Sequence, residues 1–279
     1  MHAPKTTRQP MIEPRRHDGV TEWRFSSLGS RLAGYAASTF LTADGILIDT
    51  GIPAARREFA RLLQGSRVRG VIITHHHEDH AGNVELVAAR GLPLWIAPAT
   101  QPLLQAVSPI GAYRRVTWTA MTPLTSLVRP FDPGSLEVLP APGHCADHHV
   151  VWDAASRTLF AGDLFLGVAV RVAHHDEDLW NSIDSLERIA ALEPERMFCA
   201  HRGLVPDAAA ALRAKAEWMR RMIDTVQTEI AHGQSDDAIL RTVLGGESVT
   251  GWASAGEYSR RNFIELVRRR RTKPAPTHP

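Results

Sequence analysis

This chain of 279 residues has few cysteines, no long apolar run and no large excess of either charge. Its two cysteines, Cys145 and Cys199, are too few for a disulfide framework and suit a reducing compartment. No stretch approaches the roughly 18 consecutive apolar residues of a transmembrane helix, and the charged N-terminus lacks the apolar core of a secretory signal. We therefore expect a cytoplasmic protein without a membrane partner.

Charge balance and histidine content narrow the function further. Because 32 Lys and Arg stand against 30 Asp and Glu, the whole chain does not have the charge of a polyanion binder. Histidine, by contrast, is abundant: 14 of the 279 residues, roughly twice ordinary usage. Since histidine is the commonest transition-metal ligand, this excess directs attention to histidine clusters.

The order of apolar patterns predicts an α/β protein with a helical C-terminal part. Short apolar runs typical of buried strands alternate with helical patterns up to about residue 206. Helical patterns alone follow, over residues 208–231, 235–244 and 256–271. We expect a flexible, proline-containing lead-in over residues 1–20, a main domain over 21–206 and a helical extension over 207–279. Residues 98–135 lack periodicity, which is typical of a lid or binding loop.

The sequence HHHEDH directly follows the strand-like run at residues 71–74. His75 and His77 can project to one side of this segment, and Asp79 and His80 can face a second centre. Imidazole and carboxylate together suit Zn²⁺ and similar ions. The segment therefore predicts part of a metal site.

Three further strand-like runs end in a histidine or an aspartate. His144 follows the run at 136–139, Asp163 follows that at 158–161, and His201 follows that at 197–200. Ligands of open α/β sheets gather beyond the carboxyl ends of strands, so these side chains are expected to meet. Together with HHHEDH they supply seven donors, enough for two metals with positions left open for water, as in catalytic sites.

The chain resembles the metallo-β-lactamase fold in five ordered motifs: ILIDTG (46–51), THHHEDHAGN (74–83), PGHCADH (142–148), FAGDLFLG (160–167) and CAHRG (199–203). The resemblance implies an αβ/βα sandwich with a dinuclear site at one edge. It implies one metal on His75, His77 and His144, a second on Asp79, His80 and His201, and Asp163 bridging the two. It also implies that Asp49 orients a ligand imidazole. His148 either orients groups of the site or is an ordinary core histidine, and both interpretations stay open.

Such a site predicts hydrolysis by a hydroxide shared between two divalent ions, Zn²⁺ first and Fe or Mn as alternatives. The expected substrate is a small molecule with an ester-like bond: a thioester, a lactone, another carboxylic ester or a phosphodiester. Asp79 can hold the hydroxide as well as bind metal, which makes it the candidate catalytic residue. Asp163 and the missing export signal argue against a true β-lactamase, and the pattern resembles the glyoxalase II type and a β-lactamase-like endoribonuclease subgroup more closely.

Other functions stay open on the sequence alone. Sulfur dioxygenases of this fold share the H-x-H-x-D-H pattern but use one iron and a thiol substrate. The arginine run 268–271 could serve a nuclease or a nucleic-acid-binding module, although a net charge of +2 gives this weak support. An open site argues against metal storage, and a homodimer stays open.

Substrate contacts are expected on two sides of the site. The irregular segment offers Tyr113, Arg115 and Trp118 as lid residues, and the stretch after Asp163 offers Arg171, His174 and His175 for the opposite wall. An arginine there could pair with a substrate carboxylate or phosphate. The alternative for each is an ordinary surface charge or rim packing.

Overall fold

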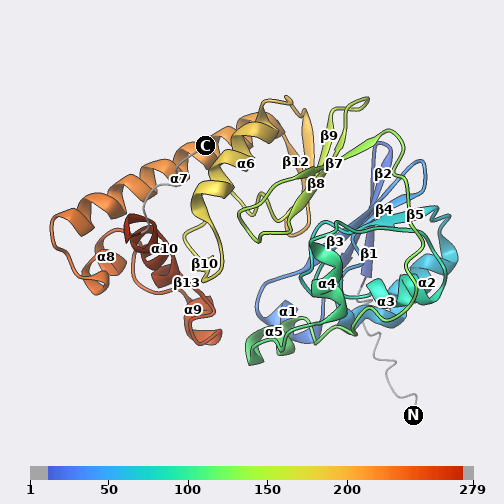
Figure 1. The fold of residues 1–279 in the computed structure, drawn as a ribbon, viewed down its shortest axis with the longest axis horizontal. Coiled ribbons are helices and arrows are strands. Elements are labelled where there is room, and N and C mark those ends of the chain that lie inside the picture. Colours follow the sequence, from blue (N-terminus) through green and yellow to red (C-terminus); the bar gives the residue numbers. More distant parts are fainter. Residues whose placement is uncertain (1–11, 273–279) are drawn as a thin grey trace, which may run out of the picture.

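The computed structural model describes residues 12–272 and contains two packed β-sheets with helices on both outer sides (Figure 1). The first sheet has six strands in chain order, antiparallel from β1 to β4 and parallel from β4 to β6. These strands are β1 (Ile12–His17), β2 (Val20–Phe25), β3 (Ala37–Thr42), β4 (Ile46–Ile48), β5 (Gly70–Ile72) and β6 (Leu94–Trp95).

The second sheet has five strands in the order β12-β11-β9-β8-β7, of which only β9 and β11 pair in parallel. They are β7 (Leu136–Pro140), β8 (His149–Asp153), β9 (Thr158–Gly162), β11 (Arg196–Cys199) and β12 (Gly203–Pro206). The αβ/βα sandwich expected from the sequence is thereby confirmed.

The apolar runs form strands that are buried on both faces. In β4, Ile48 packs between the sheets while Leu47 faces the helices, because successive strand residues point to opposite faces. Phe40, Phe160 and Phe198 fill the layer between the sheets, and the rings of Phe160 and Phe198 stack 5.4 Å apart. Burial on both faces explains why these strands read as continuous apolar runs rather than alternating ones.

Helices cover the outer face of each sheet. The first half of the chain contributes α1 (Leu28–Leu32), η1 (Pro53–Ala55), α2 (Arg56–Gly65), α3 (Val84–Ala89), α4 (Thr100–Gln105) and α5 (Ala112–Thr117). The second half contributes α6 (Leu179–Ala190), α7 (Ala208–Ala231), α8 (Asp236–Thr242), α9 (Val249–Ala253) and α10 (Arg260–Thr272). The irregular segment 98–135 thus holds two short helices, α4 and α5. No helix within residues 12–272 is long and apolar enough to cross a bilayer.

The helical extension folds back toward the sandwich. In Figure 1, α7 runs outward from the second sheet, and α8, α10 and α9 return beneath it. A two-residue strand, β13 (Tyr258–Ser259), pairs with β10 (Ala173–His174) and ties the extension to the body. A hydrogen bond of 2.9 Å between the hydroxyls of Tyr35 and Thr250 joins α9 to the segment between α1 and β3. The extension therefore borders the edge where the strands of both sheets end.

The expectation of a flexible lead-in over residues 1–20 is wrong for its second half. Ile12–His17 form β1, which pairs with β2 along six residues. Pro14 is tolerated because β1 is an edge strand, where a missing N–H donor need not break a ladder. Residues 1–11 lie outside the described part of the chain.

Candidate metal centre

The histidine-rich segment lies at the carboxyl end of β5, beside the carboxyl end of β4. Since β4 and β5 are parallel, Asp49 and the HHHEDH segment emerge at the same sheet edge. The Asp49 carboxylate accepts hydrogen bonds from the Thr74 backbone N–H at 2.8 Å and from His80 Nδ1 at 2.8 Å. Asp49 itself has a left-handed backbone, with φ of 62°, which turns its side chain back over the next strand.

One group of three imidazoles converges at this edge. Nδ1 of His77 lies 3.1 Å from Nε2 of His75 and 3.0 Å from Nε2 of His144. Burial, and then the neighbouring histidines, hold the pKa values of His75 and His77 well below the ordinary range. Both rings are therefore neutral, which is the form that binds metal.

A second group joins His80, His201 and Asp79. Nε2 of His201 lies 3.3 Å from Oδ2 of Asp79, and Nε2 of His80 lies 3.9 Å from the same oxygen. Burial opposes a charge on His80 and His201, but nearby carboxylates, Asp163 foremost, hold both pKa values well above the ordinary range. The carboxylates of this second group therefore favour the positively charged form of both imidazoles.

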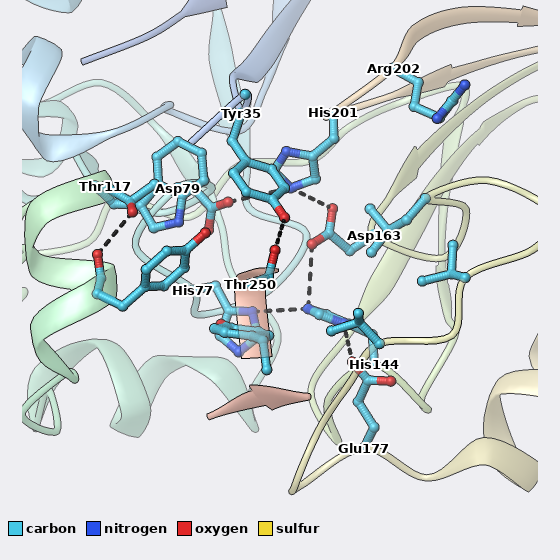
Figure 2. Close-up of a pocket in the computed structure, with 17 residues that line it drawn as sticks. Tyr35, His77, Asp79, Thr117, His144, Asp163, Glu177, His201, Arg202 and Thr250 are labelled. Atoms are coloured by element: carbon cyan, nitrogen blue, oxygen red, sulfur yellow. Dashed lines mark hydrogen bonds and ion pairs between the residues drawn. The ribbon is translucent and has the colours of Figure 1, made fainter. Parts of the chain in front are cut away.

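Asp163 lies between the two groups and faces each with one oxygen. Its Oδ1 is 3.3 Å from Nε2 of His80 and 3.2 Å from Nε2 of His201, while its Oδ2 is 3.4 Å from Nε2 of His144. Burial alone would raise the pKa of this carboxyl, but His201 and His80 hold it well below the usual range. Asp163 is therefore an anion placed to touch two centres (Figure 2).

The outer nitrogens of the imidazoles are held in place, which leaves the inner ones free. Nδ1 of His80 faces Asp49, Nδ1 of His201 lies 2.8 Å from the carbonyl of Ala36, and Nδ1 of His75 lies 3.0 Å from the Thr74 hydroxyl. A ring whose Nδ1–H is donated outward presents the lone pair of Nε2 inward. Three histidines thus direct Nε2 at the same small space, where a bound cation would replace the proton that the carboxylates favour on His80 and His201.

These residues fit metal ions. The inner atoms His80 Nε2 and Asp163 Oδ1 are buried and have no hydrogen-bond partner among the described residues. Buried polar atoms are rarely left unsatisfied, so such a pair indicates a missing partner. Ligand atoms at 2.0–2.1 Å from a tetrahedral zinc lie about 3.3 Å apart, close to the spacings within both groups. Candidate metal-binding triplets are His75, His77 and His144; His75, His80 and Asp163; and Asp79, His80 and His201.

His148 supports the site without facing it. Its Nε2 accepts a hydrogen bond of 2.9 Å from the backbone N–H of Asp163, and its Nδ1 donates to the carbonyl of Ala141 at 3.1 Å. Gly162 makes this contact possible, because an added Cβ at that position would lie 2.7 Å from His148 Nε2. Of the two interpretations of His148, the geometry matches the one in which it orients a group of the site.

A cavity of about 380 Å³ opens onto these groups (Figure 2). His77, Asp79, His144, Asp163 and His201 form its floor. The walls are largely aromatic and aliphatic, and the principal wall residues are Tyr35, Tyr113, Trp118, Leu166, Val170, Val172, Arg202, Thr250 and Tyr258. The site is thus a metal-type floor in a mostly apolar pocket.

Two of the six expected substrate contacts, Tyr113 and Trp118, line this cavity. Arg115 does not, because it lies two positions after Tyr113 on α5, about 200° around the helix, and is exposed.

The other three, on the stretch after Asp163, do not line the cavity either. Arg171 donates to the carbonyl of Leu244 at 3.4 Å, His174 packs 5.1 Å from the ring of Tyr258, and His175 is exposed.

Several wall residues were not predicted. Tyr35, Thr250 and Tyr258 come from segments that carry no motif: Tyr35 lies between α1 and β3, and Thr250 and Tyr258 reach the site through the folded-back extension. Arg202 directly follows His201 in the CAHRG motif, so its place beside a ligand could have pointed to it. Glu177, whose Oε1 lies 3.5 Å from Nδ1 of His144, had no signal in the sequence.

Arg114, next to the expected Arg115, holds the wall to the floor. Its guanidinium binds both oxygens of Glu78, with Nε to Oε1 at 2.6 Å, and also reaches Oε1 of Glu257 at 3.4 Å. Glu78 lies between two floor residues, and Glu257 precedes Tyr258. Arg114 therefore links α5, the histidine-rich segment and the helical extension.

Comparison with known proteins agrees with this geometry. The sequence model of the Metallo-beta-lactamase superfamily matches residues 34–201, more than half of the chain. A hydroxyacylglutathione hydrolase of Methylobacterium nodulans is 32% identical over 209 residues, which cover 73% of this chain and 75% of that protein. A Beta-lactamase-like protein 2 homolog of Caenorhabditis elegans is 27% identical over 172 residues and 59% of this chain, but this chain spans only 55% of that relative's length.

Solved structures share the fold. A crystal structure of VMB-1 aligns with a TM-score of 0.58 at 16% identity, covering 75% of this chain and 97% of that one. A metallo-beta-lactamase from Pontibacter korlensis aligns with a TM-score of 0.57 at 20% identity, covering 75% and 99%. At these identities the likeness shows the fold alone. On the family match and the shared architecture, this chain belongs to the metallo-beta-lactamase superfamily.

Proposed function

We propose that this protein is a metal-dependent hydrolase that cleaves an ester-like bond with a hydroxide activated by two divalent ions, Zn²⁺ in the first place. The observation that carries the proposal is Asp163, which presents one oxygen to each histidine group. Bound cations would acidify a shared water and polarise the substrate oxygen. In the overall reaction water adds OH to the acyl or phosphoryl centre, the bond to the leaving oxygen or sulfur breaks, and that atom takes the remaining proton.

The chain's own residues would hold and orient the reactants. His75, His77 and His144 would form one cation site, Asp79, His80 and His201 the other, with Asp163 shared. The Asp79 carboxylate lines the cavity and is 7% exposed, so it can accept a hydrogen bond from the attacking water and hold it toward the substrate. The apolar walls would keep other water away from the reacting centre.

Carboxylic esters and thioesters are favoured over nucleic acids. The relatives named hydroxyacylglutathione hydrolase support an acyl substrate. The basic end of α10 is occupied within the chain: Arg268 pairs with Asp236, Arg269 donates to the carbonyl of His175 at 3.1 Å, and Arg270 lies over the ring of Trp180. Residues 273–279 of the expected basic tail lie outside the described part of the chain.

A chelation test on purified protein decides the proposal. Zinc-loaded enzyme is assayed on a thioester, a lactone, a carboxylic ester and a phosphodiester before and after removal of metal. We expect turnover of at least one acyl substrate that disappears with the metal and returns when zinc is restored. Full activity in metal-free protein, or oxygen uptake with a thiol substrate by protein holding one iron, would contradict the proposal.

A further inference from the structure

The walls of the cavity are rich in aromatic side chains. Four aromatic residues line it: Tyr35, Tyr113, Trp118 and Tyr258. The rings of Tyr35 and Trp118 lie 6.5 Å apart, those of Tyr113 and Tyr258 lie 6.4 Å apart, and Trp118 is 8% exposed. Ring spacings of this size are those of interacting aromatic pairs, and the two pairs together offer an aromatic surface against which a flat apolar group can pack.

The aromatic walls are tied together at two points. The hydroxyl of Tyr35 bonds to that of Thr250, and Arg114 joins α5 to Glu257 on the neighbouring segment of the extension. Trp118 also lies 6.2 Å from the ring of His201 on the floor. A ring-shaped group bound among these residues would therefore sit beside the reacting bond.

Positive charge on the walls is confined to one place, while Glu177, beside His144, supplies a carboxylate. Among the lining residues that the structure describes, Arg202 is the one arginine or lysine, and no carboxylate in residues 12–272 forms an ion pair with it. Arg114, next to the lining residue Tyr113, is already bound to two carboxylates. The buried Lys215, in an adjoining hollow, donates to the carbonyl of Leu164 at 2.8 Å. Arg202 thus offers an exposed, uncommitted guanidinium, a group that binds carboxylate or phosphate oxygens in pairs.

Arg202 lies on a different side of the floor from Asp79. Figure 2 shows Arg202 at the edge of the pocket, with His201 between it and Asp79. An added Cβ at Gly167 would lie 3.6 Å from Nη1 of Arg202, which places the guanidinium over the loop that carries the aliphatic wall residues Leu166 and Val170. The pocket therefore has an aromatic flank and a flank with a single positive charge.

We propose that the site takes small esters or thioesters that carry an apolar ring on one side of the scissile bond and a single anionic group on the other. The ring binds among the four aromatic residues, and Arg202 determines specificity by binding the anion. The cavity, at the small end of the roughly 300–1,000 Å³ typical of ligand pockets, suits a compact molecule. A large polyanionic leaving group would find one cation only. This inference rests on the proposed hydrolase function.

Four matched esters test the ring and the anion separately. Phenylacetyl glycolate carries both, phenylacetyl glycolamide lacks the charge, and acetyl glycolate lacks the ring; benzyl succinate exchanges the two sides. With the zinc-loaded enzyme we expect kcat/KM for the ring-bearing anion, in one of its two orientations, to exceed that for the neutral amide and for the acetyl ester by at least about tenfold, as a charged hydrogen bond implies. Hydroxyacylglutathione should be a poorer substrate than the best of these.

Variants assign the preference to residues. Arg202→Gln should bring the ratio of charged to neutral ester toward one, and Arg202→Lys should restore part of it. Arg115→Gln is the matched control, because Arg115 is exposed and outside the cavity. Trp118→Leu should reduce the ratio of phenylacetyl to acetyl ester, and Tyr113→Leu replaces it if the buried Trp118 proves necessary for folding.

A binding measurement separates this inference from the proposed function. Phenylacetylglycine, an amide that resists hydrolysis, is titrated calorimetrically into wild-type and Arg202→Gln holoprotein. Binding that weakens about tenfold in the variant supports the inference even if none of the four esters is turned over. Absence of turnover on every substrate of the chelation test would instead contradict the proposed function. Turnover of all four esters with ratios near one, a preference for hydroxyacylglutathione, or equal binding of the amide to both proteins would overturn the inference alone.

Discussion

The floor and the walls of the cavity are built in different ways. Every floor residue follows a strand of the sandwich. The outer nitrogens of the floor residues His201 and His144 lie against Ala36 and Glu177, and those of the adjoining His80 and His75 against Asp49 and Thr74. The walls come from α5, from the loops before β3 and after β9 and β11, and from the extension, and they are held by few links, chiefly Arg114 and the bond between Tyr35 and Thr250. From this comparison we expect the sheets to provide the chemistry and the peripheral segments to select the substrate.

The largest expected effect comes from breaking the floor at its shared residue. Asp163→Asn keeps the shape but removes the negative charge between the two histidine groups, so we expect loss of bound metal and of at least about 99.9% of activity, as for a residue needed by both ions. Elemental analysis and turnover of the same preparation measure this. An Asp163→Asn protein with normal metal content and normal turnover would show that the floor does not need a shared carboxylate.

The next largest effect is on the link between floor and wall. Glu78 and Arg114 have side chains that are 3% and 13% exposed, so Arg114→Met leaves a buried carboxylate without its partner. We expect a loss of about 3–5 kcal/mol in the free energy of unfolding, measured by urea denaturation. The neighbouring Arg115→Met should change it by less than about 0.5 kcal/mol, because that side chain is exposed. Equal effects of the two substitutions would remove the structural role of Arg114.

A smaller effect is expected from Asp49, which holds the ligand histidine His80 in place. Asp49→Asn weakens the acceptor of the His80 Nδ1–H bond without touching the inner atoms. We expect metal affinity to fall about 10- to 100-fold, as for other residues that orient ligand histidines. Competition with a zinc chelator measures the affinity. The Asp44→Asn variant, on an exposed turn, serves as the control, and matching affinities in the two variants would contradict the role given to Asp49.

The smallest effect belongs to the wall alone. Tyr35→Phe and Thr250→Val each remove one side of the 2.9 Å hydroxyl pair, which is partly exposed. We expect each to raise KM with little change in metal content. Each should also lower the free energy of unfolding, measured by urea denaturation, by about 0.5–1.5 kcal/mol. The double variant should cost no more than either single one, since both remove the same bond. Additive losses would show that the two hydroxyls do not act together.

The floor could be predicted from sequence, whereas of the walls only Tyr113 and Trp118 were, for physical reasons. Ligand residues such as His144 and Asp163 directly follow apolar strand patterns, and strand ends of one sheet edge meet whatever the loops do. Tyr258 and Thr250 lie on β13 and α9, which are too short to show a period. Their position depends on the pairing of β13 with β10, a contact between residues 173–174 and 258–259.

Two further differences between the sequence predictions and the structure also have physical reasons. Pro14 made residues 12–17 read as loop, yet an edge strand tolerates proline. Arg171, His174 and His175 follow the Asp163 motif closely but face the extension and solvent, because the chain turns at 171–176 before α6 begins. Nearness to a motif in sequence therefore predicted wall residues less well than the strand ends predicted the floor.

The number of metal ions that the intact chain binds tests the central claim most directly. Metal-free protein is titrated with zinc, and bound metal and ester hydrolysis are measured at each step. Two ions per chain, with full activity reached only when both are bound, are predicted from Asp163 facing both histidine groups. Saturation at one ion with full activity, or hydrolysis without any metal, would contradict the account.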